Sequence, residues 1–120
     1  MENKTANLLN YTLEDREGTK ILRVTGAINA GTRTEMERLV NALTQRFNLI
    51  IDMGGVTTVS SSGLKSLMGL CSNARNRGKR VLLMRAGIDL VAMIERMEMQ
   101  EFFIFIENVE EGRRKLRYYT

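Results

Sequence analysis

The most constraining feature of the chain is the stretch at residues 49–70, LIIDMGGVTTVSSSGLKSLMGL. It opens with an apolar run at 49–51, which is typical of a strand buried on both faces of a sheet. Two glycines interrupt the run, so we expect a turn at 52–55 and then a short β-branched segment at 56–59. Three serines follow, and after them apolar residues recur at helical spacing. The stretch therefore predicts a strand that leads into a helix, with hydroxyl groups at the junction.

Hydrophobic periodicity along the rest of the chain predicts strands and helices in alternation. We expect strands at residues 11–16, 20–25, 81–84 and 101–106, and helices at 33–45, from 63 to the glycine at 78, at 88–97 and from 108 onward. This order predicts an α/β fold in which a mixed, mainly parallel sheet of about five strands carries about four helices. No linker or repeat divides the chain, so we expect a single domain over residues 1–120, with its core at about 11–110, a lead-in at 1–10 and a C-terminal helix or tail at 108–120.

Shorter patterns predict local features of the helices. Thr32, followed three residues later by Glu35, fits a capping box at the start of the first helix. Leu67 falls on the apolar face of the second helix, and Gly112 is expected to weaken the last one. The apolar face of the third helix is expected to consist of Ile88, Val91, Ile94 and Met97.

The composition argues against catalysis and cofactor binding. The sequence has no histidine, which removes the commonest general base and the commonest nitrogen ligand for metals. Neither a GxxxxGKS/T phosphate loop nor a GxGxxG loop occurs, and the acidic residues show no metal-ligand spacing. Ser62 and Lys65 form a conceivable nucleophile and base, but on a helix Lys65 is expected to point to solvent. Cys71, the only cysteine, is expected to be a small buried hydrophobe. We therefore expect no enzyme activity, no cofactor and no metal.

Charge and hydropathy indicate which partners and which cellular location to expect. It carries 18 Lys and Arg against 14 Asp and Glu, a net charge of +4. This basicity is mild, and no basic helix with interleaved aromatic residues occurs, so nucleic-acid binding is not expected. No apolar run approaches the roughly 20 residues of a membrane span, and the N-terminal residues lack the apolar region of a signal peptide. The expected location is the cytoplasm, with no membrane partner.

Two roles are open for the serines at residues 60–62. One hydroxyl can cap the following helix by accepting a hydrogen bond from a free backbone N–H of its first turn. Alternatively, a serine at this junction is exposed at the carboxyl edge of the sheet, where α/β folds usually place their sites. Phosphorylation there would add about 1.5–2 negative charges, which the start of a helix tolerates. The modification would then change what can dock on this edge while the domain stays folded.

A family resemblance rests on residues 26–30 (GAINA), 49–52 (LIID) and 59–64 (VSSSGL). With these segments the chain resembles the STAS domain over about residues 11–110, and more narrowly it resembles the bacterial anti-sigma factor antagonists. In that family the last segment reads Asp-Ser-Ser-Gly-Leu, and its first serine is the phosphorylation site. The match in this chain is Ser61. Two residues depart from the family: Ser60 stands in place of the acidic residue, and Asn29 stands where an acidic residue is often found.

The resemblance implies a partner switch. The unmodified chain would bind an anti-sigma factor that is also a serine kinase, and so release a sigma factor. The kinase, using ATP and magnesium, would phosphorylate Ser61 and be freed, and a serine phosphatase of the PP2C type would reset the cycle. Ser60 and Ser62 are the alternative sites of modification. The implied docking edge consists of Asn29, Ala30, Thr32, Ser60, Ser62, Gly63, Lys65 and Ser66, with Lys65 and Ser66 on the exposed side of the helix.

Two other functions are compatible with the same fold. A phosphorylation-independent STAS interaction module could bind its partner in another signalling or secretion pathway, and Ser60 in place of the acid favours this alternative. An enzyme or a small-ligand protein could use the same sheet edge, but the missing histidine, phosphate loop and metal spacing argue against it. The chain is expected to be a monomer or a weak dimer, because the apolar strand at 102–106 could lie at a sheet edge.

Overall fold

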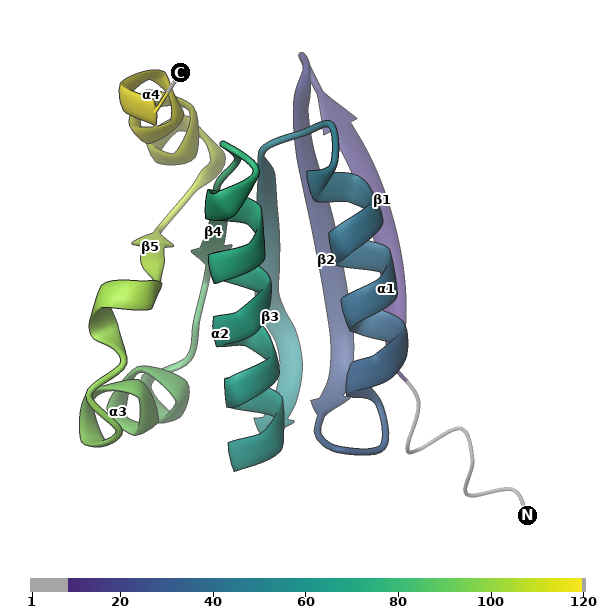
Figure 1. Ribbon diagram of the computed structural model, residues 1–120, viewed down its shortest axis with the longest axis vertical. Helices are drawn as coiled ribbons and strands as arrows, with labels where there is room; N and C mark the ends of the chain where they lie inside the picture. Colours follow the sequence, from purple (N-terminus) through teal and green to yellow (C-terminus); the bar gives the residue numbers. More distant parts are fainter. Residues whose placement is uncertain (1–8, 120) are drawn as a thin grey trace.

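The computed structural model describes residues 9–119, which form one α/β unit (Figure 1). Its strands are β1 (Asn10–Arg16), β2 (Thr19–Ile28), β3 (Leu49–Val59), β4 (Val81–Met84) and β5 (Ile104–Ile106), and its helices are α1 (Arg33–Thr44), α2 (Ser61–Asn76), α3 (Ile88–Arg96) and α4 (Val109–Tyr119). The strand order is β1-β2-β3-β4-β5, and only β1 runs antiparallel to its neighbour. For the described residues, the predicted mixed and mainly parallel sheet of five strands with four helices is confirmed.

Side chains pack against both faces of the sheet. In Figure 1, α1 and α2 lie side by side over one face, and the main core lies between the sheet and the helices α1, α2 and α3. The other face carries a smaller cluster under α4, which consists of Ile21, Ile50, Leu82, Met84, Ile106 and Val109. Successive residues of a strand point to opposite faces, so Leu49 and Ile51 enter the main core while Ile50 enters the smaller cluster. The apolar run at 49–51 is buried on both faces, as predicted.

Gly112 lies where α4 contacts the sheet. A Cβ atom at this position would come within 2.7 Å of Ile50 Cδ1 and 2.9 Å of Ile106 Cδ1. Glycine in the interior of a helix is expected to weaken it, yet α4 continues through Gly112. Here it also lets α4 approach the sheet closely, which the sequence did not indicate.

Replacement of Gly112 by alanine is expected to lower the free energy of unfolding by about 1 kcal/mol. Overpacking a core costs about 1–3 kcal/mol, and the better helix propensity of alanine offsets about 1 kcal/mol of it. Gly69→Ala in α2 is a matched control, because nothing lies within 4 Å of a Cβ there. The control is expected to raise stability by about 0.5–1 kcal/mol. Urea denaturation measures both changes, and equal stabilisation by the two variants would contradict the close packing of α4.

Three glycines predicted to end strands lie inside them. β2 continues through Gly26 to Ile28, and β3 runs without interruption from Leu49 to Val59. The predicted strand end at residue 25 and the predicted turn at 52–55 were therefore wrong. The pairing of β2 with β3 shifts register twice, and Gly26 has a φ of 119°. These glycines permit bulges in paired strands, and a sequence does not distinguish such bulges from turns.

Several helix details also differ from the sequence expectations. The side chain of Thr32 makes no cap hydrogen bond to α1, so the predicted capping box was wrong. On α3 the buried residues are Leu90 and Ile94, whereas Ile88 is 84% exposed. Residues of a helix are about 100° apart, so Ile88 lies about 200° around the axis from Leu90 and faces away from the sheet. Ile94 is buried as predicted. The last strand is shorter than predicted, because a 3₁₀ turn at Gln100–Phe102 takes the place of its first residues.

Candidate functional site

The junction between β3 and α2 presents the three serines at the carboxyl end of the sheet. Ser60 is the N-cap of α2, and its Oγ accepts a hydrogen bond from the Gly63 amide at 3.1 Å. The Ser60 amide donates to the Ile28 carbonyl at 3.0 Å, which ties the start of α2 to the end of β2. The capping role predicted for one of the serines therefore belongs to Ser60.

Gly63 allows α2 to begin directly against β2. The residue is buried, and a Cβ atom there would lie 2.3 Å from the Ile28 carbonyl oxygen and 2.8 Å from the carbonyl carbon. Any side chain would force the helix away from the strand. Gly63 thus fixes the geometry of the predicted docking edge and offers it no exposed side chain.

Ser61 and Ser62 have exposed side chains in the first turn of α2. Within residues 9–119, the hydroxyl groups of both serines make no hydrogen bond to protein. The first turn of a helix is its positive end, which favours an added negative group. Since Ser60 does the capping, the exposed Ser61 hydroxyl is not needed to hold the start of α2.

The loop between β2 and α1 lies beside these serines and is held by its own side chains. Asn29 Oδ1 accepts hydrogen bonds from the amides of Gly31 at 2.9 Å and Thr32 at 3.1 Å. Thr32 is buried; its Oγ1 donates to the Ala27 carbonyl at 2.8 Å and accepts from the Asn29 amide at 3.0 Å. Of the residues predicted here for partner binding, Ala30 is exposed, Asn29 is half-buried, and Thr32 shapes the loop from inside.

On the exposed face of α2, Lys65 lies at the surface as predicted. Ser66 was expected there too, but it is buried, because its hydroxyl donates to Glu37 Oε2 of α1 at 2.6 Å. That hydrogen bond, with help from Arg33, holds the pKa of the Glu37 carboxyl below its usual value. Ser62 and Lys65 line a polar groove of about 460 Å³ between α1 and α2. The predicted edge therefore has a polar side, bounded by the two helices.

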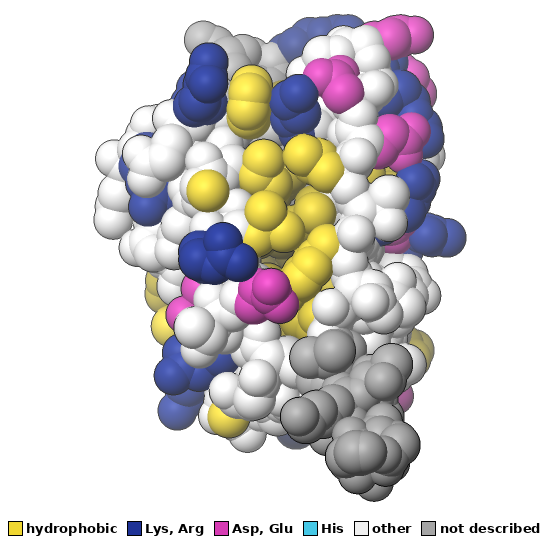
Figure 2. Space-filling view, turned by 90° about the vertical axis from the view of Figure 1, so that its right-hand side faces the viewer, with side chains coloured by type: hydrophobic (Ala, Val, Ile, Leu, Met, Phe, Trp, Pro, Cys, Tyr) yellow, Lys and Arg dark blue, Asp and Glu magenta, His cyan; other side chains and the backbone are white. Residues whose placement is uncertain are grey.

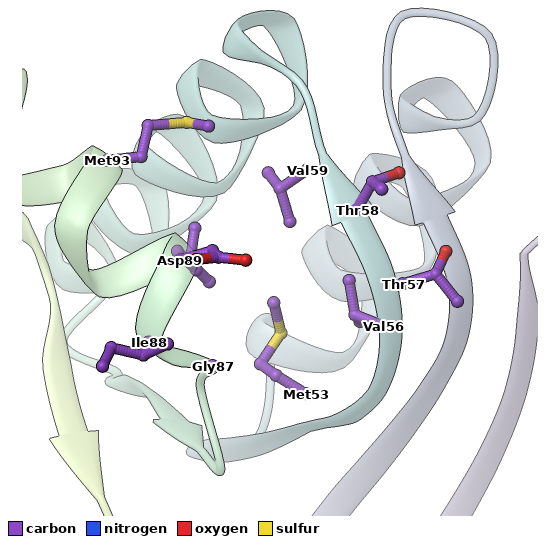
Figure 3. Close-up of a pocket in the computed structure, with 10 residues that line it drawn as sticks. Met53, Val56, Thr57, Thr58, Val59, Gly87, Ile88, Asp89 and Met93 are labelled. Atoms are coloured by element: carbon purple, nitrogen blue, oxygen red, sulfur yellow. The ribbon is translucent and has the colours of Figure 1, made fainter.

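A second groove, of about 330 Å³, lies on the other side of the junction (Figure 3). It is formed by the second half of β3 and by α3, and its apolar lining includes Met53, Val56, Val59, Leu90 and Met93. In Figure 3 the Asp89 side chain points toward the groove and the Ile88 side chain points away from it. This groove was not predictable from the sequence, because it is formed by elements about 30 residues apart that no motif connects. It gives the edge an apolar side next to the serines.

Asp52 of β3 links β2 to the residue that follows β4, on the face of the sheet opposite α1 and α2. The side chain is 2% exposed and accepts hydrogen bonds from Arg85 Nε at 2.9 Å, Arg85 Nη2 at 2.8 Å, Arg23 Nε at 3.2 Å and the Gly54 amide at 2.9 Å. Burial alone would raise the pKa of this carboxyl, but the hydrogen bonds from Arg85 and the Gly54 amide hold it below its usual value. The sequence placed Asp52 only at the end of an apolar run. Its partners lie 29 and 33 residues away, so they were not predictable.

The described part of the chain offers little for thiol or metal chemistry. Cys71 is buried as predicted, and burial raises the pKa of its thiol to about 12, so the thiolate that would react is rare. Among residues 9–119 no group of three or more Cys, Asp or Glu side chains is arranged to hold a metal ion. In the same residues, no helix has both the length and the apolar character needed to cross a membrane.

Solved structures show the same fold. An anti-sigma factor antagonist from Mycobacterium paratuberculosis is similar over 91% of this chain and 94% of its own, with 21% identity and a TM-score of 0.74. The anti-sigma factor antagonist SpoIIAA is similar in its unphosphorylated form, with 15% identity and a TM-score of 0.66 over 90% of this chain and 98% of its own. The phosphorylated form of SpoIIAA, from Bacillus, has 13% identity and a TM-score of 0.65 over 88% and 98% of the two chains.

The fold also occurs within a much larger protein. The murine anion transporter Slc26a9 is similar over 75% of this chain and 18% of its own, with 18% identity and a TM-score of 0.60. The family model of the STAS domain matches residues 10–112, which span β1 to the first turn of α4. The chain therefore belongs to the STAS domain family.

Proposed function

We propose that this chain is an anti-sigma factor antagonist controlled by phosphorylation of Ser61. Unmodified, it binds an anti-sigma factor that is also a serine kinase; phosphorylated, it is released, and a PP2C-type phosphatase restores it. The chain acts in the cytoplasm as a substrate and a binding module, not as an enzyme. The observation that carries the proposal is that the exposed Ser61 hydroxyl makes no hydrogen bond to any described residue, while its neighbour Ser60 caps the helix. The similar structures that are named anti-sigma factor antagonists support it.

The chemistry of the edge supports a switch without refolding. A phosphoserine adds about 1.5–2 negative charges and three acceptor oxygens. At Ser61 that charge would lie at the positive end of α2, where it is tolerated. The fold would persist, as it does in SpoIIAA, whose unphosphorylated and phosphorylated forms are both similar to this chain. What changes is the docking edge, where a bulky dianion would displace a partner in close contact with Ser61, Ser62 and Lys65.

Ser61→Asp is expected to weaken binding to the kinase-type anti-sigma factor at least 100-fold, and Ser61→Ala is expected to keep binding but lose phosphorylation. A loss of 100-fold corresponds to about 2.7 kcal/mol, within the range for a charge buried unpaired at an interface. Each purified kinase-type anti-sigma factor of the host is titrated calorimetrically with the wild type and both variants. Asn76→Asp, which adds the same charge at an exposed site at the far end of α2 and outside the groove, is the matched control and is expected to bind normally.

The same proteins are then incubated with ATP and magnesium, and the modified residue is mapped by mass spectrometry. A phosphoryl group on Ser61 supports the proposal. A phosphoryl group on Ser60 or Ser62 instead would overturn the assignment to Ser61, although the switch itself would stand. Binding that Ser61→Asp leaves intact, with no phosphorylation at all, would contradict the switch.

That last outcome would favour a second candidate, a STAS interaction module that works without phosphorylation. The observation in its favour is Ser60, which satisfies the N-terminus of α2 without a negative charge. The similarity to part of an anion transporter supports the use of this fold in proteins other than sigma-factor regulators. Such a module would keep its affinity for its partner in both Ser61 variants.

A further inference from the structure

The outer edge of β1 is free in the described part of the chain. β1 lies at one end of the sheet and pairs only with β2. The two strands are joined by the two-residue loop Glu17-Gly18, in which both residues have positive φ, at 54° and 87°. Such a loop is closed by a hydrogen-bonded pair, here Arg16 and Thr19, and hydrogen-bonded pairs then alternate along the hairpin.

This alternation fixes which backbone groups point outward. Arg16, Glu14, Thr12 and Asn10 direct their N–H and C=O groups toward β2, so Tyr11, Leu13 and Asp15 direct theirs away from the sheet. The side chains of these three outward-bonding residues lie on the face covered by α1, since Tyr11 and Leu13 pair with the core residues Val24 and Leu22. A row of unpaired backbone groups is a template for another strand.

The same edge exposes apolar surface. Figure 2, which views the molecule from the β1 side, shows hydrophobic side chains gathered in a central stripe with charged side chains around it. Leu13 is 48% exposed, and Tyr11, Leu39 and Leu43 are only half-buried against the core. The charged Glu14 and Arg16 lie on the opposite face of the strand, where they pair with each other. They therefore leave the apolar face of the edge uncovered.

We propose that a second copy of this chain pairs with β1, strand against antiparallel strand, with Leu13 opposite Leu13 on a two-fold axis. Leu13 is the middle residue of the seven in β1, so this register pairs every residue of the strand with a residue of the other strand. It also joins outward-bonding residues to outward-bonding residues, because Leu13 meets Leu13 and Tyr11 meets Asp15. The result is a continuous sheet of ten strands with the two α1 helices adjacent on one face.

Charge selects this register over a neighbouring one. Burial and the charge of Glu35 raise the pKa of the Tyr11 phenol, and the charge of Arg38 opposes them. In the Leu13-centred pairing the Asp15 carboxylate of the second copy, which bonds its own Lys20 at 2.6 Å, arrives opposite Tyr11. Arg38 is largely exposed and pairs with Glu35 only at 3.6 Å, so it can turn toward this second carboxylate. If each strand moved by one residue toward its own hairpin loop, Glu14 of one copy would lie opposite Glu14 of the other. Two like charges directly opposite each other destabilise the pairing. No two like charges are directly opposite in the proposed register.

Cysteine cross-linking tests the proposal and its register together. Paired residues that exchange hydrogen bonds have Cα atoms about 5.5 Å apart, which suits a disulfide. Leu13→Cys is therefore expected to form a disulfide-linked dimer under mild oxidation. Thr12→Cys is the matched control: it would lie diagonal to its counterpart at about 7–8 Å, beyond easy bridging, and is expected to stay largely monomeric. The native Cys71 is buried and stays in place, and the wild type under the same oxidant measures its contribution.

Sedimentation equilibrium of the reduced proteins tests the dimer without a cross-link. The wild type is expected to show concentration-dependent dimerisation. Leu13→Lys is expected to abolish it, because it places two ammonium groups opposite each other, whereas Thr12→Lys, which meets Glu14, is expected to preserve it. A wild type that stays monomeric at high concentration, or a dimer that survives Leu13→Lys, would overturn the proposal. Preferential cross-linking of Thr12→Cys would overturn the Leu13-centred register.

Discussion

Gly63→Ala is expected to lower the free energy of unfolding by about 2–4 kcal/mol and to weaken partner binding at the same edge. The added Cβ would lie 2.3 Å from the Ile28 carbonyl oxygen, and both nearest atoms belong to the backbone, so no side-chain rotation relieves the contact. The helix must move, which strains the hydrogen bond from the Ser60 amide to the same carbonyl. Overpacking of this kind costs about 1–3 kcal/mol and occasionally more, and a lost hydrogen bond adds about 1 kcal/mol. Chemical denaturation and calorimetric binding measure the two effects.

The control for this change is Gly69→Ala, six residues further along α2, where a Cβ meets nothing within 4 Å. It is expected to raise stability by about 0.5–1 kcal/mol, because alanine favours helix over glycine. If Gly63→Ala behaved like the control, the close approach of α2 to β2 would be wrong. If it lost stability but kept full affinity, Gly63 would be a packing residue with no effect on the docking edge.

Asp52→Asn is expected to lower the free energy of unfolding by about 2–3 kcal/mol. Removing one partner of a buried ion pair typically costs 3–5 kcal/mol, and the half-exposed Arg23 and Arg85 reduce that cost because both keep some contact with water. Asparagine keeps the size of the side chain, so the change isolates charge from packing. Arg85→Lys is the companion variant: it retains the charge, loses the two-point hydrogen bond to the carboxylate, and is expected to cost less.

The same pair predicts how stability depends on pH. The pKa of Asp52 is lowered in the folded state, so the ionised form is the one that the fold favours. This contribution is fully present above the unfolded pKa of about 3.9 and is lost as the pH falls through the lower folded value. Between pH 5 and pH 2 the wild type should therefore lose more stability than Asp52→Asn, and the two denaturation curves should converge. Parallel pH profiles for the two proteins would contradict the assignment.

The sequence predicted elements and their order well, because each depends on a local pattern. The apolar run at 49–51 and the helical spacing after Gly63 are visible in short windows, and the buried Leu67 and Cys71 follow from that spacing. The glycines misled the prediction where they serve pairing between strands. Whether Gly26 ends a strand or permits a bulge depends on the register of β3, which lies about 30 residues away.

In the candidate site, too, local features were predictable and contacts between distant elements were not. The junction of strand, serines and helix was predictable, and so was a capping role for one of the serines. Ser60 takes this role, and Ser61 bonds no residue within 9–119; only the backbone geometry at the junction could show this assignment. The burial of Ser66 depends on Glu37 in another helix, and the apolar groove depends on where α3 returns to the sheet. Contacts between distant elements were beyond any local pattern.

The buried Cys71 allows the opening of α2 to be measured by thiol labelling without an engineered probe. It is the only thiol in the sequence, and it faces the core from α2, the helix whose first turn carries Ser61. A thiol reagent reaches it only when α2 separates from the sheet, so the labelling rate, compared with that of a free thiol, gives the free energy of that separation. Labelling with and without phosphate on the edge would then reveal whether the modification loosens or tightens the helix, with no probe attached beforehand.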